Sequence, residues 1–338
     1  MRPRPVVVIA GTREEGPPPG VDNASEYVEL RHAEDLPALI DMISEAEGIL
    51  LWGAEREWLQ EAWPRAGRLR WIHSPSDGVE WFLFPELIES DVAVTNARGV
   101  FDDSIAEWVI GAMLAFAARI LVQRDAQNRG EWIAGTTERL AGTRLLVVGP
   151  GPIGRAVARR ARALGMEVGG AGRTARADDI LGTIVATDDS AALNAALGTA
   201  DVVLDAMPLT PATRGFFDAV RFRAMKPSAR FINVGRGATV DQVALIEALQ
   251  AGTIAGAALD VFEIEPLPAD SPLWAMPHVL VSPHMSGDFE GWETATVAVF
   301  VDNAARFARG EPLRNLVDKS AGHGSDGPAD LPKGAVGP

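Results

Sequence analysis

Short apolar runs alternate with longer amphipathic stretches along most of this chain. The pattern predicts strands at residues 5–10, 48–52, 69–73 and 92–96, and a second series at residues 144–148, 167–171, 201–206, 230–234, 257–261 and 279–282. Helical periodicity separates these runs, for example at residues 33–46, 153–164 and 241–251. Such alternation is typical of βαβ units. We therefore expect an α/β protein with doubly wound parallel sheets.

Two further stretches are predicted to be a long helix and a disordered tail. Residues 102–127 keep a helical pattern, with acidic residues at the start and Arg119 and Arg124 suited to the last turn, which predicts one long helix. Residues 319–338 are rich in Gly, Pro, Asp and Lys and lack periodicity. Such a segment cannot bury enough apolar surface to fold, so we expect a disordered tail.

Composition narrows the class of protein. The 338 residues are enough for two domains. A net charge of -15, from 31 basic and 46 acidic residues, disfavours nucleic acid as a partner and makes any arginine in a pocket informative. Absence of cysteine excludes disulfides, thiolate metal sites and cysteine nucleophiles. Because the apolar runs are short, we expect a cytoplasmic protein with no membrane partner.

A glycine-rich loop joins a predicted strand to a predicted helix. It reads GPGPIG, with Gly149, Gly151 and Gly154 in the GxGxxG spacing and Pro152 and Ile153 opening the helix. The three glycines allow a tight turn, a close approach of pyrophosphate to the backbone, and close packing of helix on strand. The strand and helix around the loop indicate a dinucleotide site rather than an ordinary Gly/Pro turn.

The end of the next predicted strand bears on which dinucleotide binds. Enzymes that use NAD carry an acidic residue about 20 positions after the loop, where it binds the ribose hydroxyls. Here that position is Gly172, followed by Arg173 and Thr174, with Arg176 close behind. A missing carboxylate and a nearby guanidinium favour the 2′-phosphate, and hence NADP(H) over NAD(H). The alternative is that these arginines are solvated charges in a loop and bind no phosphate.

Three residues of complementary chemistry follow strands of the second series. Arg236 lies between two glycines in NVGRG, Glu265 precedes Pro266, and His284 lies in SPHMSG. Ligands of open α/β sheets bind beyond the carboxyl ends of strands. A glutamate beside an imidazole orients it and raises its pKa, which suits a general acid or base at a carbonyl. Arg236, Glu265 and His284 are therefore the candidate catalytic residues.

The chain resembles the D-isomer-specific 2-hydroxyacid dehydrogenase family, which includes glyoxylate/hydroxypyruvate reductases and phosphoglycerate dehydrogenase. The resemblance is carried, in the family's order, by SDGVE, TNARGVFDDSIAEWV, LLVVGPGPIGRAVARRARALGM, AMPLTPATRG, FINVGRGATVD, GAALDVFEIEPLP, SPHMSG and GEPLRNLVD. These segments cover most of residues 70–318. The resemblance implies an NAD(P)-dependent oxidoreductase that acts on the CH–OH group of a small 2-hydroxy acid.

The resemblance also implies roles for single residues. Arg236 would bind the substrate carboxylate and carbonyl, His284 would transfer the proton, and Glu265 rather than Glu263 would be its partner. Substrate would also be held by backbone amides around Ser76, Asp77, Gly78 and Val79. Asp260 would contact the nicotinamide carboxamide, and the cofactor groove would include Met207, Pro208, Thr213, Val234, Gly235, Ser286 and Gly287.

A two-domain architecture and a homodimer are further implications of the resemblance. A flavodoxin-like substrate domain would comprise residues 1–98 and 288–318, with a Rossmann cofactor domain inserted at residues 99–287. Dimerisation would use the long helix and residues 130–141, with Trp132. Trp52 and Trp292 either wall the substrate pocket or are half-buried packing residues.

Some features keep other functions open. Pro152 stands where many members of the family carry a basic residue, which leaves pyrophosphate binding to backbone amides. The leading hypothesis is an NADP(H)-preferring 2-keto acid reductase acting on a small acid such as glyoxylate or hydroxypyruvate. One alternative keeps the catalytic residues but uses NAD(H) with phosphoglycerate, phosphite or an aryl-pyruvate. Another is a dinucleotide-sensing regulator with little turnover.

Overall fold

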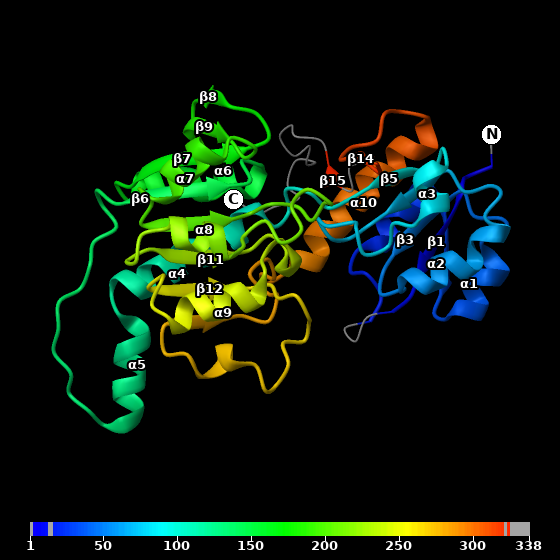
Figure 1. Ribbon diagram of the computed structural model, residues 1–338. Coiled ribbons are helices and arrows are strands. Elements are labelled where there is room, and N and C mark those ends of the chain that lie inside the picture. Colours follow the sequence, from blue (N-terminus) through cyan, green and yellow to red (C-terminus); the bar gives the residue numbers. More distant parts are fainter. Residues whose placement is uncertain (1–2, 13–15, 321–322, 325–338) are drawn as a thin grey trace. The chain divides into compact units, whose positions relative to one another are not determined.

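The computed structural model describes residues 3–12, 16–320 and 323–324, and the chain in it divides into two compact units (Figure 1). Unit 1 comprises Met1–Phe101 and Phe289–Pro338, and unit 2 comprises Asp102–Asp288. Unit 2 is thus an insertion in the sequence of unit 1. Both units are α/β with parallel sheets, which confirms the predicted fold class.

Unit 1 is built on a five-stranded parallel sheet with the order β2-β1-β3-β4-β5, as in flavodoxin-like folds. The strands are β1 (Val6–Ala10), β2 (Glu29–Ala33), β3 (Gly48–Leu51), β4 (Trp71–His73) and β5 (Ala93–Thr95). Its helices are α1 (Leu36–Met42), α2 (Arg56–Ala62), α3 (Pro85–Glu89) and α10 (Trp292–Arg309), with short 3-10 turns η1 (Val21–Glu26) and η2 (Trp63–Arg65). The edge strand β2 was not predicted.

Alternate residues of this sheet enter two separate cores. Val8, Ile49 and Ile72 pack with Leu39 of α1 and Leu59 of α2. The neighbouring strand positions Val7, Leu50 and Trp71 pack on the opposite side, against η1 and against α10, which contributes Phe300 and Ala304. Successive strand residues point to opposite faces. Burial on both faces explains why these strands read as continuous apolar runs.

Unit 2 contains an eight-stranded sheet with the order β13-β12-β11-β10-β6-β7-β9-β8, parallel except for β8. The strands are β6 (Arg144–Val148), β7 (Glu167–Gly172), β8 (Arg176–Asp178), β9 (Gly182–Ala186), β10 (Val202–Asp205), β11 (Arg230–Asn233), β12 (Gly256–Leu259) and β13 (Val279–Val281). The chain reverses its direction of winding between β6 and β10, the switch point at which Rossmann sheets bind ligands.

Helices of unit 2 surround this sheet. They are α4 (Asp102–Ala117), α5 (Ile120–Arg129), α6 (Pro152–Ala163), α7 (Ser190–Leu197), α8 (Ala219–Ala224) and α9 (Gln242–Gln250), with 3-10 turns η3 (Gly237–Thr239) and η4 (Pro272–Ala275). Side chains of α7, α8 and α9 share one core with Leu146, Val203 and Phe231 of the strands. In addition, α4 packs along α6.

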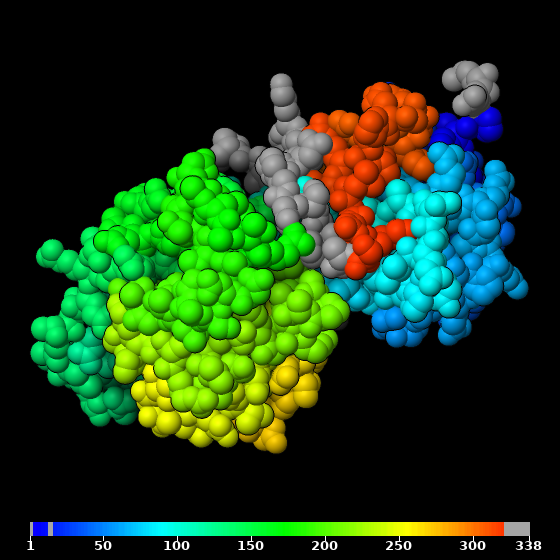
Figure 2. Space-filling model, turned by 45° about the horizontal axis from the view of Figure 1, so that its top comes forward, coloured from blue at the N-terminus to red at the C-terminus, as the bar shows by residue number. Residues whose placement is uncertain are grey.

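The predicted long helix is broken. Helix α4 ends at Ala117, Arg119 adopts a left-handed φ of 57°, and α5 begins at Ile120 at an angle of 64° to α4. Helix α5 points away from the sheet, and an arm formed by residues 130–141 runs from its far end back to β6 (Figure 1). In the space-filling view α5, in teal, forms the edge of unit 2 (Figure 2).

The C-terminal residues that the structure describes make definite contacts. Lys319 donates hydrogen bonds to the carbonyls of Leu87, Ser90 and Val92. A two-stranded sheet pairs β14 (Val317–Asp318) with β15 (His323–Gly324). The rest of the predicted disordered tail lies outside the described residues. Within those residues no single helix is long and apolar enough to cross a bilayer, and only the bent pair of α4 and α5 passes that test by length and composition.

Candidate active site

Loops at the carboxyl edge of the unit 2 sheet are packed backbone to backbone. A Cβ on Gly149 would lie 2.5 Å from the Ala206 oxygen, and one on Gly235 would lie 2.6 Å from the Met207 oxygen. A Cβ on Gly237 would lie 1.8 Å from the Phe262 carbonyl carbon. Only glycine fits at such distances. These glycines bring together the loops that follow β6, β10, β11 and β12.

His284 and Glu265 form a hydrogen-bonded pair at this edge. The His284 Nδ1 lies 2.8 Å from Glu265 Oε2, and Glu265 Oε1 accepts from the Phe262 N–H at 2.8 Å. The carboxylate hydrogen bond raises the pKa of His284 and outweighs the opposing effect of burial. Burial works to raise the pKa of Glu265, but the hydrogen bonds from His284 and Phe262 outweigh it and hold that pKa below its ordinary value.

The loop that carries His284 is fixed by Asp260. His284 has a left-handed φ of 53°, and its N–H donates to the Asp260 carbonyl at 2.8 Å. The Asp260 carboxylate accepts from the Met285 N–H at 2.9 Å, from the Ser286 N–H at 3.1 Å and from the Ser286 hydroxyl. Asp260 is only 2% exposed. Its side chain therefore orients the histidine loop.

Arg236 lies near the pair but is not part of it. Its Nη1 donates to the Gly235 carbonyl at 2.7 Å, and its own carbonyl accepts from Asn233 Nδ2 at 3.2 Å. The Arg236 charge lowers the pKa of both His284 and Glu265, although in each case it is a smaller cause than their mutual hydrogen bond. A guanidinium, an imidazole and a carboxylate thus lie within electrostatic reach of one another.

The glycine loop has the geometry that a dinucleotide requires. Gly149 has a φ of 102°, which favours glycine, and a Cβ on Gly154 would lie 2.4 Å from the Gly149 oxygen. A Cβ on Gly151 would meet open space, and α6 begins directly after it at Pro152 with no side-chain cap. Amides at a helix N-terminus bind phosphate. The residues present fit NAD(P)(H).

Residues at the end of β7 face this loop. Gly172 is the last residue of β7, and Arg173 and Thr174 follow it as exposed residues. Gly149 N–H donates to the Ala171 carbonyl at 3.1 Å, which places the glycine loop beside the end of β7. No carboxylate stands at position 172.

Other predicted cofactor contacts lie in the loops after β10 and β11. Met207 is 5% exposed and its N–H donates to Asp205 Oδ1 at 3.0 Å. Thr213 donates to the Pro208 carbonyl at 2.7 Å and thereby closes the turn between them. Val234, Gly235 and Ser286 are buried, whereas Gly287 is partly exposed and accepts from the Ser104 hydroxyl.

Comparisons with known proteins decide the family. Residues 110–286, just over half of the chain, match the family model described as "D-isomer specific 2-hydroxyacid dehydrogenase, NAD binding domain". Glyoxylate/hydroxypyruvate reductase B of Pectobacterium carotovorum subsp. carotovorum (strain PC1) is 35% identical, with 84% of this chain and 88% of the relative covered. The chain belongs to the D-isomer-specific 2-hydroxyacid dehydrogenase family. It is an NAD(P)-dependent oxidoreductase acting on the CH–OH group of its donor.

Solved structures of other family members have the same fold. The D-isomer specific 2-hydroxyacid dehydrogenase of Xanthobacter autotrophicus Py2, in complex with NADPH and MES, is 30% identical with a TM-score of 0.78 and covers 95% of this chain and 100% of its own. An NADPH-dependent glyoxylate/hydroxypyruvate reductase from Sinorhizobium meliloti, in complex with NADP and sulfate, is 28% identical with a TM-score of 0.78 and the same coverage.

Unit 1 of the dehydrogenase holds the remaining predicted substrate residues. Ser76, Asp77 and Gly78 are partly exposed in the loop after β4, whereas Val79 is buried. Asn96 Nδ2 donates to the Asp77 carbonyl at 2.6 Å, and Ala97 N–H donates to the Ser76 carbonyl at 3.1 Å. This loop is therefore held against the end of β5.

Trp52 and Trp292 lie together in unit 1. Trp52 is 1% exposed, lies in the core of unit 1 and stacks on Trp292 at a centroid distance of 6.5 Å. A side chain so completely buried does not wall an open pocket, so the packing alternative holds for Trp52. Trp292 also contacts Phe101, with ring centroids 6.1 Å apart.

Sequence reasoning missed one acidic residue of the dehydrogenase. Asp205 ends β10, is 0% exposed, and accepts from Thr239 Oγ1 at 2.5 Å as well as from Met207. The same Thr239 hydroxyl reaches the Arg236 carbonyl at 2.5 Å. Burial raises the pKa of Asp205 to about 7. The sequence feature that could have identified Asp205 is its position as an acidic residue at the end of the apolar run VVLD.

In residues 3–12, 16–320 and 323–324 no three His, Cys, Asp or Glu side chains come together as metal ligands.

Proposed function

We propose that this dehydrogenase is an NADP(H)-preferring reductase of a small 2-keto acid, such as glyoxylate or hydroxypyruvate, and yields the D-2-hydroxy acid. The observation that carries the proposal is the His284–Glu265 hydrogen bond, with Arg236 in electrostatic reach and a dinucleotide loop in the same unit. Bound NADPH supplies the hydride that the carbonyl carbon accepts. The chain must supply the proton and hold the acid.

His284 is suited to give the proton. Its Nδ1 is occupied by Glu265, which leaves Nε2 to face the carbonyl oxygen. The carboxylate favours the protonated imidazole, and for this reason the pKa of His284 is raised. On reduction the Nε2–H bond breaks and the new alcohol O–H bond forms. In the oxidation direction the neutral imidazole takes that proton back.

Arg236 is suited to hold the carboxylate and polarise the carbonyl. A planar guanidinium matches a carboxylate in two parallel hydrogen bonds. The global charge of -15 opposes anion binding, so a local cation is needed.

The preference for NADP(H) rests on the end of β7. Gly172 offers no carboxylate for ribose hydroxyls, and the exposed Arg173 and Thr174 would bind the 2′-phosphate. Two solved relatives of similar fold are bound to NADPH or NADP, which supports the same preference here. We assign the enzyme to the cytoplasm, where NADPH is available.

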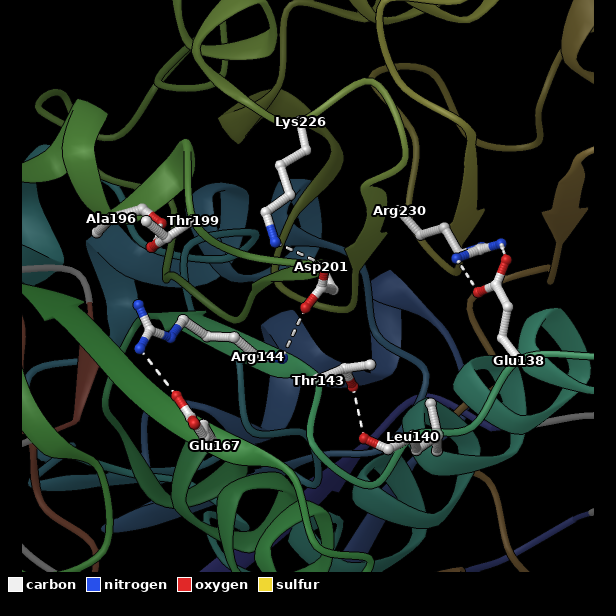
Figure 3. A network of polar contacts seen from close by, with 10 residues as sticks. All are labelled: Glu138, Leu140, Thr143, Arg144, Glu167, Ala196, Thr199, Asp201, Lys226 and Arg230. Carbon is white, nitrogen blue, oxygen red and sulfur yellow. Dashed lines mark hydrogen bonds and ion pairs between the residues drawn. The ribbon is translucent and has the colours of Figure 1, made fainter.

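A homodimer formed through the arm is also part of the proposal. Residues 131–139 are exposed, Trp132 is 100% exposed and Ile133 is 49% exposed. Exposed aromatic and aliphatic side chains on one segment are typical of an interface. The returning end of the arm is anchored to the sheet, because Glu138 pairs with Arg230 through two hydrogen bonds of 2.8 and 2.9 Å (Figure 3).

Light scattering on eluted protein tests the dimer. Trp132→Ala should shift the wild-type dimer toward monomer, whereas Trp274→Ala, at a 53% exposed tryptophan outside the arm, should not. A monomeric wild type, or equal effects of both changes, would refute this part of the proposal.

Turnover tests the activity itself. In the reduction assay, oxidation of NADPH and of NADH is followed with glyoxylate, hydroxypyruvate, pyruvate, phenylpyruvate and 3-phosphohydroxypyruvate as substrates. In the oxidation assay, reduction of NADP and of NAD is followed with phosphite as the substrate. We expect the highest kcat/KM with NADPH as the cofactor and either glyoxylate or hydroxypyruvate as the substrate. Tight NADPH binding without turnover on any of these would instead support the sensor hypothesis.

A further inference from the structure

We infer that Pro150 is a determinant of cofactor specificity, because its ring occupies the space that any side chain at position 172 would need. The inference deepens the proposed NADP(H) preference and rests on it. Pro150 is the first variable residue of the glycine loop, and Gly172 ends the neighbouring strand β7.

The steric conflict is specific to the proline ring. A Cβ built on Gly172 would lie 2.8 Å from Pro150 Cγ and 3.0 Å from Pro150 Cδ. Carbon atoms prefer separations of about 3.5–4.0 Å. The next atom, Ile184 Cγ2, would lie 3.6 Å away, which is an ordinary contact. Gly172 has the extended backbone of a strand, so its conformation does not itself require glycine.

Neither backbone is free to move apart. Gly172 pairs with Ala186 of β9, and its carbonyl accepts from the Thr187 N–H at 2.9 Å. On the other side, Gly149 N–H donates to the Ala171 carbonyl at 3.1 Å, and its Cβ position is filled by the Ala206 backbone. Relief of the conflict must therefore come from the Pro150 ring, which belongs to the loop that would contact pyrophosphate.

This packing bears directly on cofactor choice. An acidic side chain at the end of the second Rossmann strand binds the ribose hydroxyls of NAD. Every such side chain begins with a Cβ, and at position 172 that atom collides with Pro150. The proline thus keeps the position as glycine and leaves a nearby 2′-phosphate free of carboxylate repulsion. One substitution at position 172 cannot create a functional NAD site while Pro150 remains.

The first test measures the steric coupling without any cofactor. Melting temperatures are compared for the wild type, Gly172→Ala, Pro150→Ala and the double variant, with Pro152→Ala/Gly172→Ala as a matched control in the same loop. Gly172→Ala should lower Tm by roughly 2–8 °C. Pro150→Ala should abolish that loss in the double variant, and Pro152→Ala should not. An unchanged Tm for Gly172→Ala, or strictly additive effects, would overturn the inference.

The second test measures binding of NADPH and NADH to the full chain by fluorescence. Gly172→Asp alone should bind both cofactors more weakly than the wild type. Pro150→Ala/Gly172→Asp should bind NADH about tenfold more tightly than Gly172→Asp, the worth of a charge-assisted hydrogen bond. If Gly172→Asp alone binds NADH as tightly as the double variant does, Pro150 is not a determinant.

The two failures can be told apart. A wild type that binds NADH more tightly than NADPH refutes the proposed NADP(H) preference, and with it the role of Pro150 in that preference. The Tm comparison uses protein without cofactor, so additive effects there refute the coupling between the two residues whatever the wild type prefers.

Discussion

Replacement of Glu265 by glutamine tests whether the hydrogen bond with Glu265 makes His284 an effective proton donor. The carboxylate accepts two hydrogen bonds, one from His284 Nδ1 and one from the Phe262 N–H, each 2.8 Å long. A glutamine side chain has one carbonyl oxygen and can replace only one of these acceptors. If that oxygen keeps the Phe262 N–H, the amide nitrogen faces His284 Nδ1 and donates to it. The imidazole is then held neutral.

The expected loss follows from what the imidazole supplies. Proton transfer by a positioned side chain contributes about 10²- to 10⁴-fold to a rate. That range equals about 2.7–5.4 kcal/mol of transition-state stabilisation. Because Glu265 is the largest cause of the raised His284 pKa, the loss should also depend on pH.

The sign of the pH effect is fixed by the chemistry. Reduction needs protonated His284, so wild-type turnover falls as pH rises through a pKa that lies above the ordinary histidine value of 6.5. In Glu265→Gln that pKa is lower and the fall begins at lower pH. The ratio of wild-type to variant kcat should therefore grow between pH 6 and pH 8. Oxidation of the hydroxy acid needs neutral His284, so its turnover should instead rise with pH, and the rise should begin at lower pH in Glu265→Gln.

Steady-state kinetics across this pH range, with saturating NADPH, is the assay. Glu263→Gln is the matched control, because Glu263 is an exposed glutamate two positions away. Its backbone N–H, rather than its side chain, donates to Gln242. The reasoning is refuted if Glu265→Gln keeps the wild-type kcat and pH profile, or if both variants lose activity equally. NADPH binding should stay unchanged in both.

Two predictions concern stability. Burial raises the Asp205 pKa from 3.8 to about 7, so the stability that this group contributes is fully present below pH 3.8 and is lost as pH rises through about 7. Asp205→Asn should therefore gain about 3 kcal/mol on the wild type between pH 5 and 8 in urea unfolding. An advantage that does not change with pH would contradict this. Gly237→Ala should destabilise by at least about 1–3 kcal/mol, because its Cβ would lie 1.8 Å from the Phe262 carbonyl carbon. Gly111→Ala, exposed on α4 with nothing within 4 Å, should instead stabilise by about 0.5–1 kcal/mol, and equal effects of the two changes would refute the packing argument.

Strong apolar patterns made most of the fold predictable. The central strands of both sheets are buried on both faces, so their sequences are apolar runs with little ambiguity. The edge strand β2 reads ELRHA and is mostly not buried, so its side chains carry no such signal. The β8–β9 hairpin is likewise partly exposed, at the far edge of its sheet.

The break at Arg119 shows the limit of helical periodicity. Residues 102–127 are helical on either side of Ala118 and Arg119, and no Gly or Pro marks the change of direction. The break follows from the packing of the arm, where Glu138 N–H donates to the Ala117 carbonyl that a continuous helix would use. A contact between residues so far apart in sequence is not encoded in a local pattern.

Some features of the site could be predicted from sequence motifs, whereas others depend on contacts that only the fold creates. The glycine loop and the catalytic candidates stand in motifs with fixed spacing, so the sequence alone could nominate them. Asp260 was nominated from the resemblance as a nicotinamide contact, but the bonds of its carboxylate to Met285 and Ser286, some 25 residues away, could not be predicted because only the fold brings them close. Asp205 at the end of β10 and Thr239 in η3 likewise meet only in the folded chain.

The most direct test of the central claim is the turnover of His284→Gln with NADPH and glyoxylate or hydroxypyruvate, measured beside NADPH binding. Proton donation by His284 predicts a fall in kcat of about 10²-fold or more with an unchanged Kd for NADPH. A variant whose kcat stays within a few-fold of the wild type would contradict the claim.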